Sequence, residues 1–396
     1  MGRDQAADGR RDAPYLIVGT SVRGLVQSAA AAGYRVIAMD AFGDDDTRAA
    51  ASVFVPLPLR AGAIDPSGLA ERLSAAAARH RPAGLVYGSG LEMLPHLLDS
   101  LAPEVPVCGN QPAVLAAVQR PECLAAWLDG GPVLFPETRT ARPDAAEHWL
   151  IKPLAGSGGS GVQPAIVGAA GPNEVYQRRI RGVSLSALFL ADGNRACLLG
   201  VHQQWCRPDN SEGGGFLHGG AANRNDLTTT QLGRLRMLLD ALTARAGLRG
   251  LNGIDCIDDG QRLWLIEING RPCASLDLYD AALPGGLFHW HLQAVRGLLP
   301  EPPSQLAQRG YRVVYAPHSL TVPRGLDWPA WASDRPSPGS RVMAGAPVCT
   351  VHATDDDFEA CCQRLEALEQ QILQALREPR RPWWRALLGG QNRQLI

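Results

Sequence analysis

Four short apolar runs alternate with stretches of small and amphipathic residues in the first part of the chain. Each run has the length and the apolar continuity of a strand buried on both faces of a parallel sheet. The runs lie at 15–19, 34–40, 53–55 and 85–87, with helical stretches at 25–32 and 68–80. This β-α-β-α alternation predicts a doubly wound, Rossmann-like α/β domain over residues 14–110, after a loose lead-in at 1–13.

The pattern changes after residue 110. A helix is expected over 111–129, and strands, loops and paired helices then follow one another until a proline-rich boundary at 299–303. Beyond it the pattern predicts strands and a last amphipathic helix, at 312–315, 341–343, 348–351 and 358–376. We expect a second domain with α+β lobes, a small β-rich C-terminal domain with a terminal helix, and a tail, over 111–300, 301–378 and 379–396 respectively.

Composition narrows the function. A net charge of −1 with 19% charged residues leaves no basic surface for nucleic acid or a membrane. No apolar stretch has the length of a transmembrane helix, and the polar N-terminus has no signal-peptide core. Nine cysteines without C-x-x-C spacing argue against a disulfide framework or a zinc site. We expect a cytoplasmic protein with small-molecule partners, no nucleic-acid or membrane partner, and a homodimeric assembly.

The first strand-to-helix turn resembles a dinucleotide fingerprint only in part. Gly19 and Gly24 fit the outer positions of G-x-G-x-x-G, and Asp40 follows at a strand end. Ser21 replaces the middle glycine, whose missing side chain lets the backbone approach a pyrophosphate. The sequence therefore favours a structural and substrate-side role for this domain over NAD or FAD binding.

Lys152 is the only lysine in the chain, so arginine supplies the other 37 of the 38 basic residues. A lysine ammonium is a compact charge that fits between phosphate oxygens, and consecutive glycines let backbone N–H groups converge on an anion. Such a run follows Lys152: Gly156, Ser157, Gly158, Gly159, Ser160 and Gly161. A Walker A motif has the opposite order. The alternative is a chance lysine beside a flexible turn, but nucleotide binding is the leading hypothesis.

A second polar pattern lies further along the chain. Asp255 and Glu267 each alternate with apolar residues, and the turn at 258–260 between them predicts a β-hairpin. In such a hairpin the two acids lie close together on one face, followed on that face by Asn269 and Arg271. Hard oxygen donors without histidine or cysteine are those that Mg²⁺ prefers. The alternative is a solvated polar face of an edge hairpin.

A lysine before a glycine-rich loop, a later acid, and Glu-x-Asn-x-Arg twelve residues beyond it resemble the ATP-grasp superfamily over residues 111–300. The resemblance implies that Lys152 contacts the ATP phosphates and that the 156–161 loop closes over them. It implies two Mg²⁺ ions, with Mn²⁺ as the alternative, held by Asp255, Glu267 and Asn269. Arg271 would then neutralise the reacting phosphate.

Two positions depart from the family pattern. Arg120 stands where the family usually has an earlier nucleotide-binding lysine. In the segment between the lobes, Arg178 stands where an acid often holds the ribose or the adenine amino group. By resemblance, backbone groups at Gln177 and Ile180 would still hold the base.

Segments outside the core give a finer resemblance. They look like a branch of predicted ATP-dependent carboligases that is partly similar to biotin carboxylase. That branch occurs in archaea and methylotrophic bacteria beside genes for tetrahydromethanopterin and methanofuran. The segments that carry the likeness are 16–19, 39–44, 87–92 and 332–336.

The resemblance implies a carboxylate–amine ligase that forms an amide through an acyl phosphate. Its acceptor region is expected at 216–223, where His218 would orient a carboxylate or take the amine proton, beside Gly219 and Gly220. Glu92 is a candidate for binding a substrate amine, or else an ordinary acid at a helix start. The alternatives are a bicarbonate-using carboxylase and a nucleotide-binding sensor or scaffold without turnover.

Overall fold

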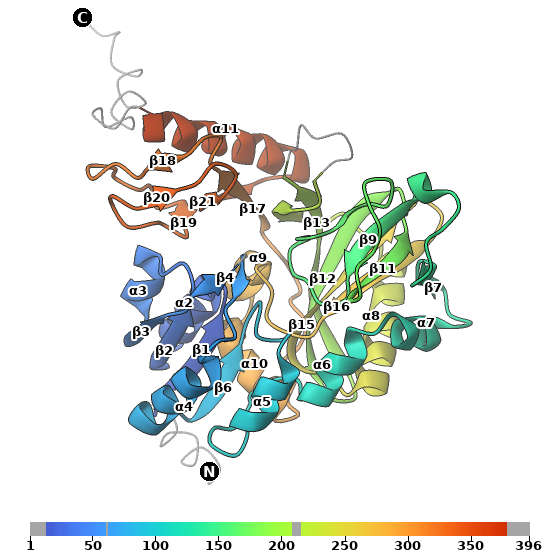
Figure 1. Ribbon diagram of the computed structural model, residues 1–396, viewed down its shortest axis with the longest axis horizontal. Helices are drawn as coiled ribbons and strands as arrows, with labels where there is room; N and C mark the ends of the chain where they lie inside the picture. The colour runs from blue at the N-terminus through green and yellow to red at the C-terminus, as the bar shows by residue number, and fades with distance from the viewer. Residues whose placement is uncertain (1–12, 61, 208–214, 378–396) are drawn as a thin grey trace, which may run out of the picture.

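A parallel sheet of four strands, in the order β3-β2-β1-β6, forms the N-terminal part of the molecule (Figure 1). The computed structural model describes residues 13–60, 62–207 and 215–377. Every neighbouring pair in this sheet is parallel, which confirms the arrangement expected from the apolar runs. The strands are β1 (Tyr15–Gly19), β2 (Val36–Asp40), β3 (Val53–Pro56) and β6 (Gly84–Tyr87).

Both faces of this sheet contribute to a core, because successive strand residues point to opposite sides and nearly all are apolar, Asp40 at the end of β2 being the exception. Ile17 belongs to a core shared with α2 and the distant α10, whereas Leu16 belongs to one shared with α4 and α5. α3 follows β2 at the carboxyl edge of the sheet. The helices are α2 (Arg23–Ala31), α3 (Asp45–Ala50), α4 (Leu69–His80), α5 (Pro95–Leu101) and α10 (Gly286–Val295).

The single helix expected over 111–129 is wrong, since the structure has two helices there. α6 (Pro112–Val118) ends before Arg120, and α7 (Pro121–Leu128) begins at the next residue. Pro121 has no N–H to donate and disfavours helical backbone in the residue before it. Arg120 accordingly has an extended conformation, with φ −92° and ψ 116°.

A small antiparallel sheet, in the order β10-β9-β11-β8, carries Lys152. Its own core contains Trp149, Ile151 and Tyr176, so it is packed separately from the other sheets. The strands are β8 (Thr138–Arg139), β9 (Trp149–Pro153), β10 (Gln163–Pro164) and β11 (Glu174–Arg178).

The largest sheet has nine strands in the order β19-β21-β17-β14-β13-β12-β15-β16-β7. It continues across the proline-rich stretch at 299–303, because β17 pairs with β14 on one side and β21 on the other. The earlier strands are β7 (Val133–Leu134), β12 (Val183–Asp192), β13 (Ala196–Cys206), β14 (His218–Asn223), β15 (Arg249–Asp258) and β16 (Leu263–Asn269). The later ones are β17 (Gln308–Tyr315), β19 (Ala332–Ser333) and β21 (Pro347–Asp355).

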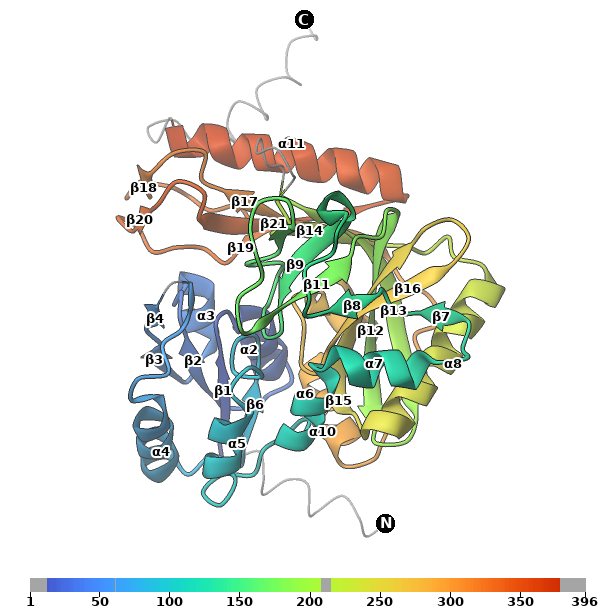
Figure 2. The same cartoon turned by 45° about the vertical axis from the view of Figure 1, so that its right-hand side comes forward.

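Two long helices pack on this sheet (Figure 2). α8 (Thr229–Ala246) begins at a capping box between Thr228 and Gln231 and buries its leucines against β12, β13 and β15. α11 (Phe358–Arg377) covers β17 and β21 and confirms the expected terminal helix. The remaining short elements are β4 (Leu59–Arg60), β5 (Ala63–Ile64), β18 (Leu320–Thr321), β20 (Arg341–Val342), α9 (Leu276–Tyr279) and the 3₁₀ turns Ala146–His148 and Asp280–Ala282.

Within the described ranges, no helix combines the length and apolarity needed to cross a membrane. The expected lead-in at 1–13, except its last residue, and the expected tail at 379–396 lie outside the described residues.

Candidate active site

The predicted hairpin of polar residues is formed by β15 and β16. Asp255 and Glu267 are direct cross-strand partners, and Asn269 pairs with Gly253. The Asn269 amide donates to Asp255 Oδ2 at 3.0 Å and to Glu267 Oε1 at 3.3 Å. The prediction that these three side chains share one face is therefore confirmed.

Lys152 reaches this hairpin from the small sheet. Its Nζ lies 3.1 Å from Glu267 Oε2 and donates to the Ile266 carbonyl at 3.3 Å. β9 and β16 belong to different sheets, so the ammonium joins the two sheets. The only lysine of the chain thus lies beside the predicted metal ligands, which argues against a chance survival.

The two acids of the hairpin differ in their electrostatics. Burial and the neighbouring Glu267 raise the pKa of Asp255, although Ser186 donates a hydrogen bond to Asp255. Burial is the largest single influence on Glu267 and favours its neutral form, but Lys152, the hydrogen bond with Asp255 and Arg271 together outweigh it and lower the pKa of Glu267. A cation placed between the carboxylates would stabilise the charged form of both. The two carboxylates are hard oxygen donors of the kind that Mg²⁺ prefers, whereas the Asn269 amide oxygen accepts from Arg271 in this arrangement.

Arg271 is held in place by the N-terminal sheet. Its Nε donates to Glu92 Oε1 at 2.5 Å, and both side chains are more than nine-tenths buried. One Nη donates to Asn269 Oδ1 at 3.2 Å and to Ser157 Oγ at 3.1 Å. Glu92, which the sequence suggested for binding a substrate amine, therefore contacts the guanidinium, and its second oxygen has no partner among the described residues.

The glycine-rich loop packs between Arg271 and the start of β14. Gly158, Gly159 and Gly161 have φ of 60°, 76° and 76°, a backbone region that glycine adopts without a steric penalty. A Cβ on Gly159 would lie 1.8 Å from the Phe216 carbonyl oxygen, and the His218 N–H donates to the Gly158 carbonyl at 3.0 Å. The loop therefore needs glycine for this close approach as well as for its conformation.

Two adjoining cavities open at this site. The smaller is lined by apolar side chains of both lobes, including Phe135, Val175 and Ile268, together with Lys152 and Gln177. The larger has a volume of about 860 Å³ and extends from Lys152, Asp255 and Arg271 to α2, the start of α3 and the C-terminal strands. A flat aromatic base and a larger polar molecule could therefore be held side by side.

The three residues expected at the base and ribose line these cavities, whereas Arg120, at the place of the family's earlier lysine, does not. Gln177 is buried and lines both, while Arg178 and Ile180 line the larger one. Arg178 is exposed, with one Nη 4.0 Å from Glu137 Oε2. Arg120 is exposed and lines neither cavity, because the break before Pro121 turns its side chain outward.

The expected acceptor region is a strand rather than a glycine-rich turn. His218 begins β14, lines the larger cavity and has its Nε2 2.9 Å from the Tyr311 hydroxyl. Burial lowers the pKa of His218 to about 4, so the ring is neutral at pH 7. Gly219 and Gly220 do not line the cavity, because they fit against the backbone of β13 and β17, where a Cβ would lie 2.7 Å and 2.4 Å from its nearest neighbour.

Several residues at the site were not found from the sequence. Ser186 contacts Asp255 of the predicted metal-ligand pair, and Ser89 contacts Ser157 of the glycine-rich loop. Ser186 lies in no motif and is placed by strand register. Ser89 lies in the segment 87–92 that carries the finer resemblance, but its contact with Ser157 depends on the packing of distant segments, which the sequence does not show.

Comparison with known proteins gives a family whose fold is consistent with this geometry. Residues 123–275 match the ATP-grasp domain family. They form an ATP-grasp domain. No curated protein matches the chain by sequence, whereas many solved structures match it by shape.

Three such structures have a similar fold over most of this chain, beyond the ATP-grasp domain itself. The biotin carboxylase domain dimer of the Hydrogenobacter thermophilus 2-oxoglutarate carboxylase, in complex with MgADP, ADP and bicarbonate, is 13% identical, with a TM-score of 0.70 over 89% of this chain and 88% of that one. An L-amino acid ligase from Bacillus licheniformis is 14% identical, with a TM-score of 0.67 over 91% and 98%. The Staphylococcus aureus N5-carboxyaminoimidazole synthetase with ADP is 13% identical, with a TM-score of 0.65 over 90% and 97%. At such identities the likeness establishes the fold.

Proposed function

We propose that this protein is an ATP- and Mg²⁺-dependent ligase that joins a carboxylate to an amine through an acyl phosphate. The observation that carries the proposal is the constellation of Lys152, Glu267, Asp255, Asn269 and Arg271 at the meeting of two sheets, beside two cavities. The ATP-grasp domain supports it, as do structural neighbours that include an amino acid ligase and a carboxylating synthetase.

The nucleotide would occupy the smaller cavity, with its base between the apolar side chains and its phosphates toward Lys152. Asp255, Glu267 and Asn269 would hold Mg²⁺, which supplies positive charge to the phosphate oxygens when bound. The loop at 156–161 would cover the phosphates with its backbone N–H groups. Because Ser157 contacts both Ser89 and Arg271, the loop is fixed at the edge of the larger cavity.

The reaction has two steps. A substrate carboxylate oxygen attacks the γ-phosphorus, the bond to the bridging oxygen breaks, and ADP leaves. Lys152 and Arg271 stabilise the charge that develops on the transferring group. The amine then attacks the acyl carbon, phosphate leaves, and the amine proton is lost. Neutral His218 lines the same cavity and is available to accept that proton, with Tyr311 fixing its ring.

The site also narrows the substrates. The larger cavity admits an organic acid and an amine beyond the nucleotide, which favours amide formation over carboxylation with bicarbonate alone. The resemblance to the predicted carboligase branch supports substrates from one-carbon cofactor biosynthesis of the tetrahydromethanopterin or methanofuran type. We place the protein among cytoplasmic homodimeric enzymes with small-molecule substrates.

Titration calorimetry with ATP and Mg²⁺ tests the nucleotide site. We expect Lys152→Ala and Glu267→Gln each to weaken ATP binding at least ten-fold, whereas Arg120→Ala leaves it within two-fold because that side chain points outward. Equal affinities in all four proteins would refute the assigned site. Once binding is established, ADP release is screened with acid and amine pairs, and with bicarbonate alone. ATP binding without turnover on any pair would support the sensor alternative, and turnover with bicarbonate alone the carboxylase.

A further inference from the structure

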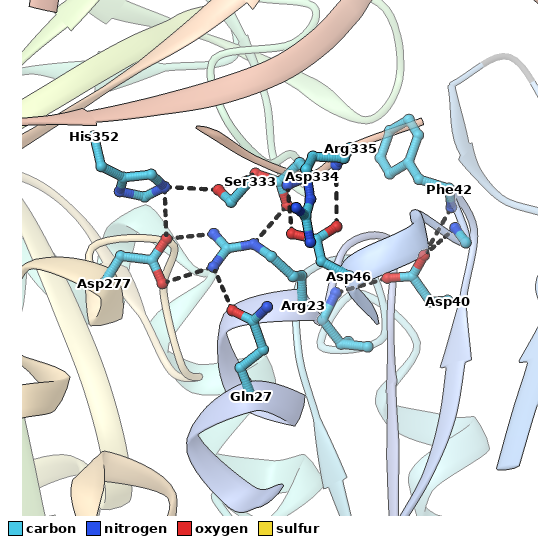
Figure 3. A network of polar contacts seen from close by, with 12 residues as sticks. Arg23, Gln27, Asp40, Phe42, Asp46, Asp277, Ser333, Asp334, Arg335 and His352 are labelled. Atoms are coloured by element: carbon cyan, nitrogen blue, oxygen red, sulfur yellow. Dashed lines mark hydrogen bonds and ion pairs between the residues drawn. The ribbon is translucent and has the colours of Figure 1, made fainter. Parts of the chain in front are cut away.

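A second polar cluster lies at the far end of the larger cavity, where the N-terminal sheet meets the C-terminal strands (Figure 3). Arg23 on α2 is its centre. Its Nε donates to Asp334 Oδ1 at 2.8 Å, and its other nitrogens donate to both oxygens of Asp277 and to Gln27. The guanidinium is therefore fully engaged by two carboxylates and an amide.

Two further acids of this cluster also have hydrogen-bond partners within the protein. Asp40 accepts backbone N–H groups of Val22, Phe42 and Gly43 at 2.7–2.8 Å. Asp46 accepts those of Asp334 and Arg335 at 2.9 and 3.0 Å, which fastens the loop after β19 to α3. These carboxylates have structural roles that explain their burial.

Asp44 differs from its neighbours. The residue is only 8% exposed and lines the cavity, and no hydrogen bond or ion pair joins its carboxylate to a described residue. Its oxygens are not among the fully buried atoms without a partner, so they reach the cavity. It precedes α3 without making a side-chain capping bond. Removing a carboxylate from most of its water without giving it a protein partner is costly, and the cavity is the side from which a ligand could supply that partner.

The surroundings make this carboxylate attractive to a positive charge. Burial, together with nearby Asp334, Asp40 and Asp46, raises the pKa of Asp44 to about 8, and Arg23 offsets this only in part. A cation bound here would remove the repulsion and satisfy the carboxylate at once. Asp40, Asp46, Asp277 and Asp334 surround the fully engaged Arg23 (Figure 3), and Asp44 is the fifth aspartate of the cluster.

An organic cation fits this position better than a metal ion. Phe42, two residues before Asp44, also lines the cavity and is 47% exposed, so its ring is accessible to a ligand. Aromatic rings beside a carboxylate suit ammonium or guanidinium groups, whereas Mg²⁺ or Ca²⁺ needs several free oxygens. Within the described ranges no group of three or more metal-binding side chains could hold a metal ion here.

We propose that the end of the larger cavity at Asp44 and Phe42 binds a cationic group of a substrate, with Asp44 as its counter-ion. α3 and β9 lie well apart, on opposite lobes of the molecule (Figure 1). The same cavity nevertheless reaches both Asp44 and Lys152, so one elongated molecule could place its cation at Asp44 and its reacting end near the nucleotide. The assignment of the cation to a ligase substrate rests on the proposed function. The binding of a cation at Asp44 does not rest on it.

The test is binding of simple amines in the absence of ATP. The probes are propylamine, benzylamine and cyclohexylmethylamine, each paired with the alcohol of the same shape. Their binding is measured by saturation-transfer NMR and by titration. We expect at least one amine to bind the wild-type protein ten-fold or more tightly than its alcohol. Asp44→Asn should reduce that preference to two-fold or less. It keeps the shape of the side chain and removes no hydrogen bond, so the variant should fold.

Asp99→Asn is the matched control, since it removes the same charge from the exposed side of α5 and should keep the preference. The proposal is wrong if no amine is preferred over its alcohol, or if Asp44→Asn retains the preference. ATP binding is measured separately on the same proteins. A lack of ATP binding with a retained amine preference would defeat the proposed function and leave the cation site standing.

Discussion

The Arg271 guanidinium and the Glu92 carboxylate form a buried ion pair with a 2.5 Å contact between residues 179 positions apart in the sequence. Arg271 follows the metal-ligand hairpin of the largest sheet, and Glu92 follows the last strand of the N-terminal sheet. The pair therefore fixes the direction of a proposed phosphate-binding group from outside the ATP-grasp domain. In the proposed reaction Glu92 would act through Arg271, as a positioning residue.

Replacing Glu92 should separate catalysis from nucleotide binding. In Glu92→Gln the charge that orients Arg271 is lost, so we expect kcat to fall at least ten-fold while the Kd for ATP changes less than two-fold. Glu122→Gln, on the exposed start of α7, is the matched control and should be neutral. A parallel fall in kcat and ATP affinity would show that Glu92 does more than position Arg271. Glu92→Ala, which strands a buried guanidinium, should cost about 3–5 kcal/mol of stability in urea unfolding.

Replacing the only lysine by arginine should weaken ATP binding, although the charge is kept. Lys152 fits a compact ammonium between Glu267 Oε2 and the Ile266 carbonyl, a space that a planar guanidinium does not match. We expect Lys152→Arg to weaken ATP binding at least ten-fold by calorimetry, despite its unchanged charge. The reverse exchange on the surface, Arg120→Lys, should have no effect. Full affinity in Lys152→Arg would mean that position 152 needs only a positive charge.

Asp44 should make the stability of the ligand-free protein depend on pH. Its pKa in the folded state, about 8, lies above the ordinary value of 3.8, so between these values the folded protein holds a proton that the unfolded chain has lost. Stability therefore falls as the pH rises through this window, by up to about 1.4 kcal/mol per pH unit from this group. Urea unfolding between pH 5 and 9 should show a shallower fall in Asp44→Asn, with the variant the more stable protein at pH 9. Identical slopes would show that Asp44 is ionised in the folded protein throughout.

Local patterns in the sequence predicted the chemistry of the hairpin well. The alternation around Asp255 and Glu267, with a turn between them, places both acids and Asn269 on one face whatever the rest of the fold. Lys152 beside its glycines was informative for a different reason, because a single lysine is unusual in a chain whose other basic residues are all arginine. The helix over 111–129 failed because Pro121 ends one helix and begins the next.

Contacts between distant segments could not be predicted in this way. The partner of Glu92 depends on how the N-terminal sheet packs against the ATP-grasp domain, which no spacing in the sequence encodes. Asp44 and Asp334 are brought together by the continuation of the largest sheet into β17, β21 and β19. An unpaired aspartate becomes visible only when the partners of all its neighbours are known.

The ion pair between Lys152 and Glu267 affects how strongly each ligand favours the binding of the other. Phosphate oxygens approaching Lys152 compete with Glu267 for the same ammonium, and Mg²⁺ approaching Glu267 competes with Lys152 for the same carboxylate. Each ligand thus releases the group that the other needs. By thermodynamic reciprocity nucleotide and metal ion would bind with positive heterotropic cooperativity, so that neither alone occupies the site as well as the two together.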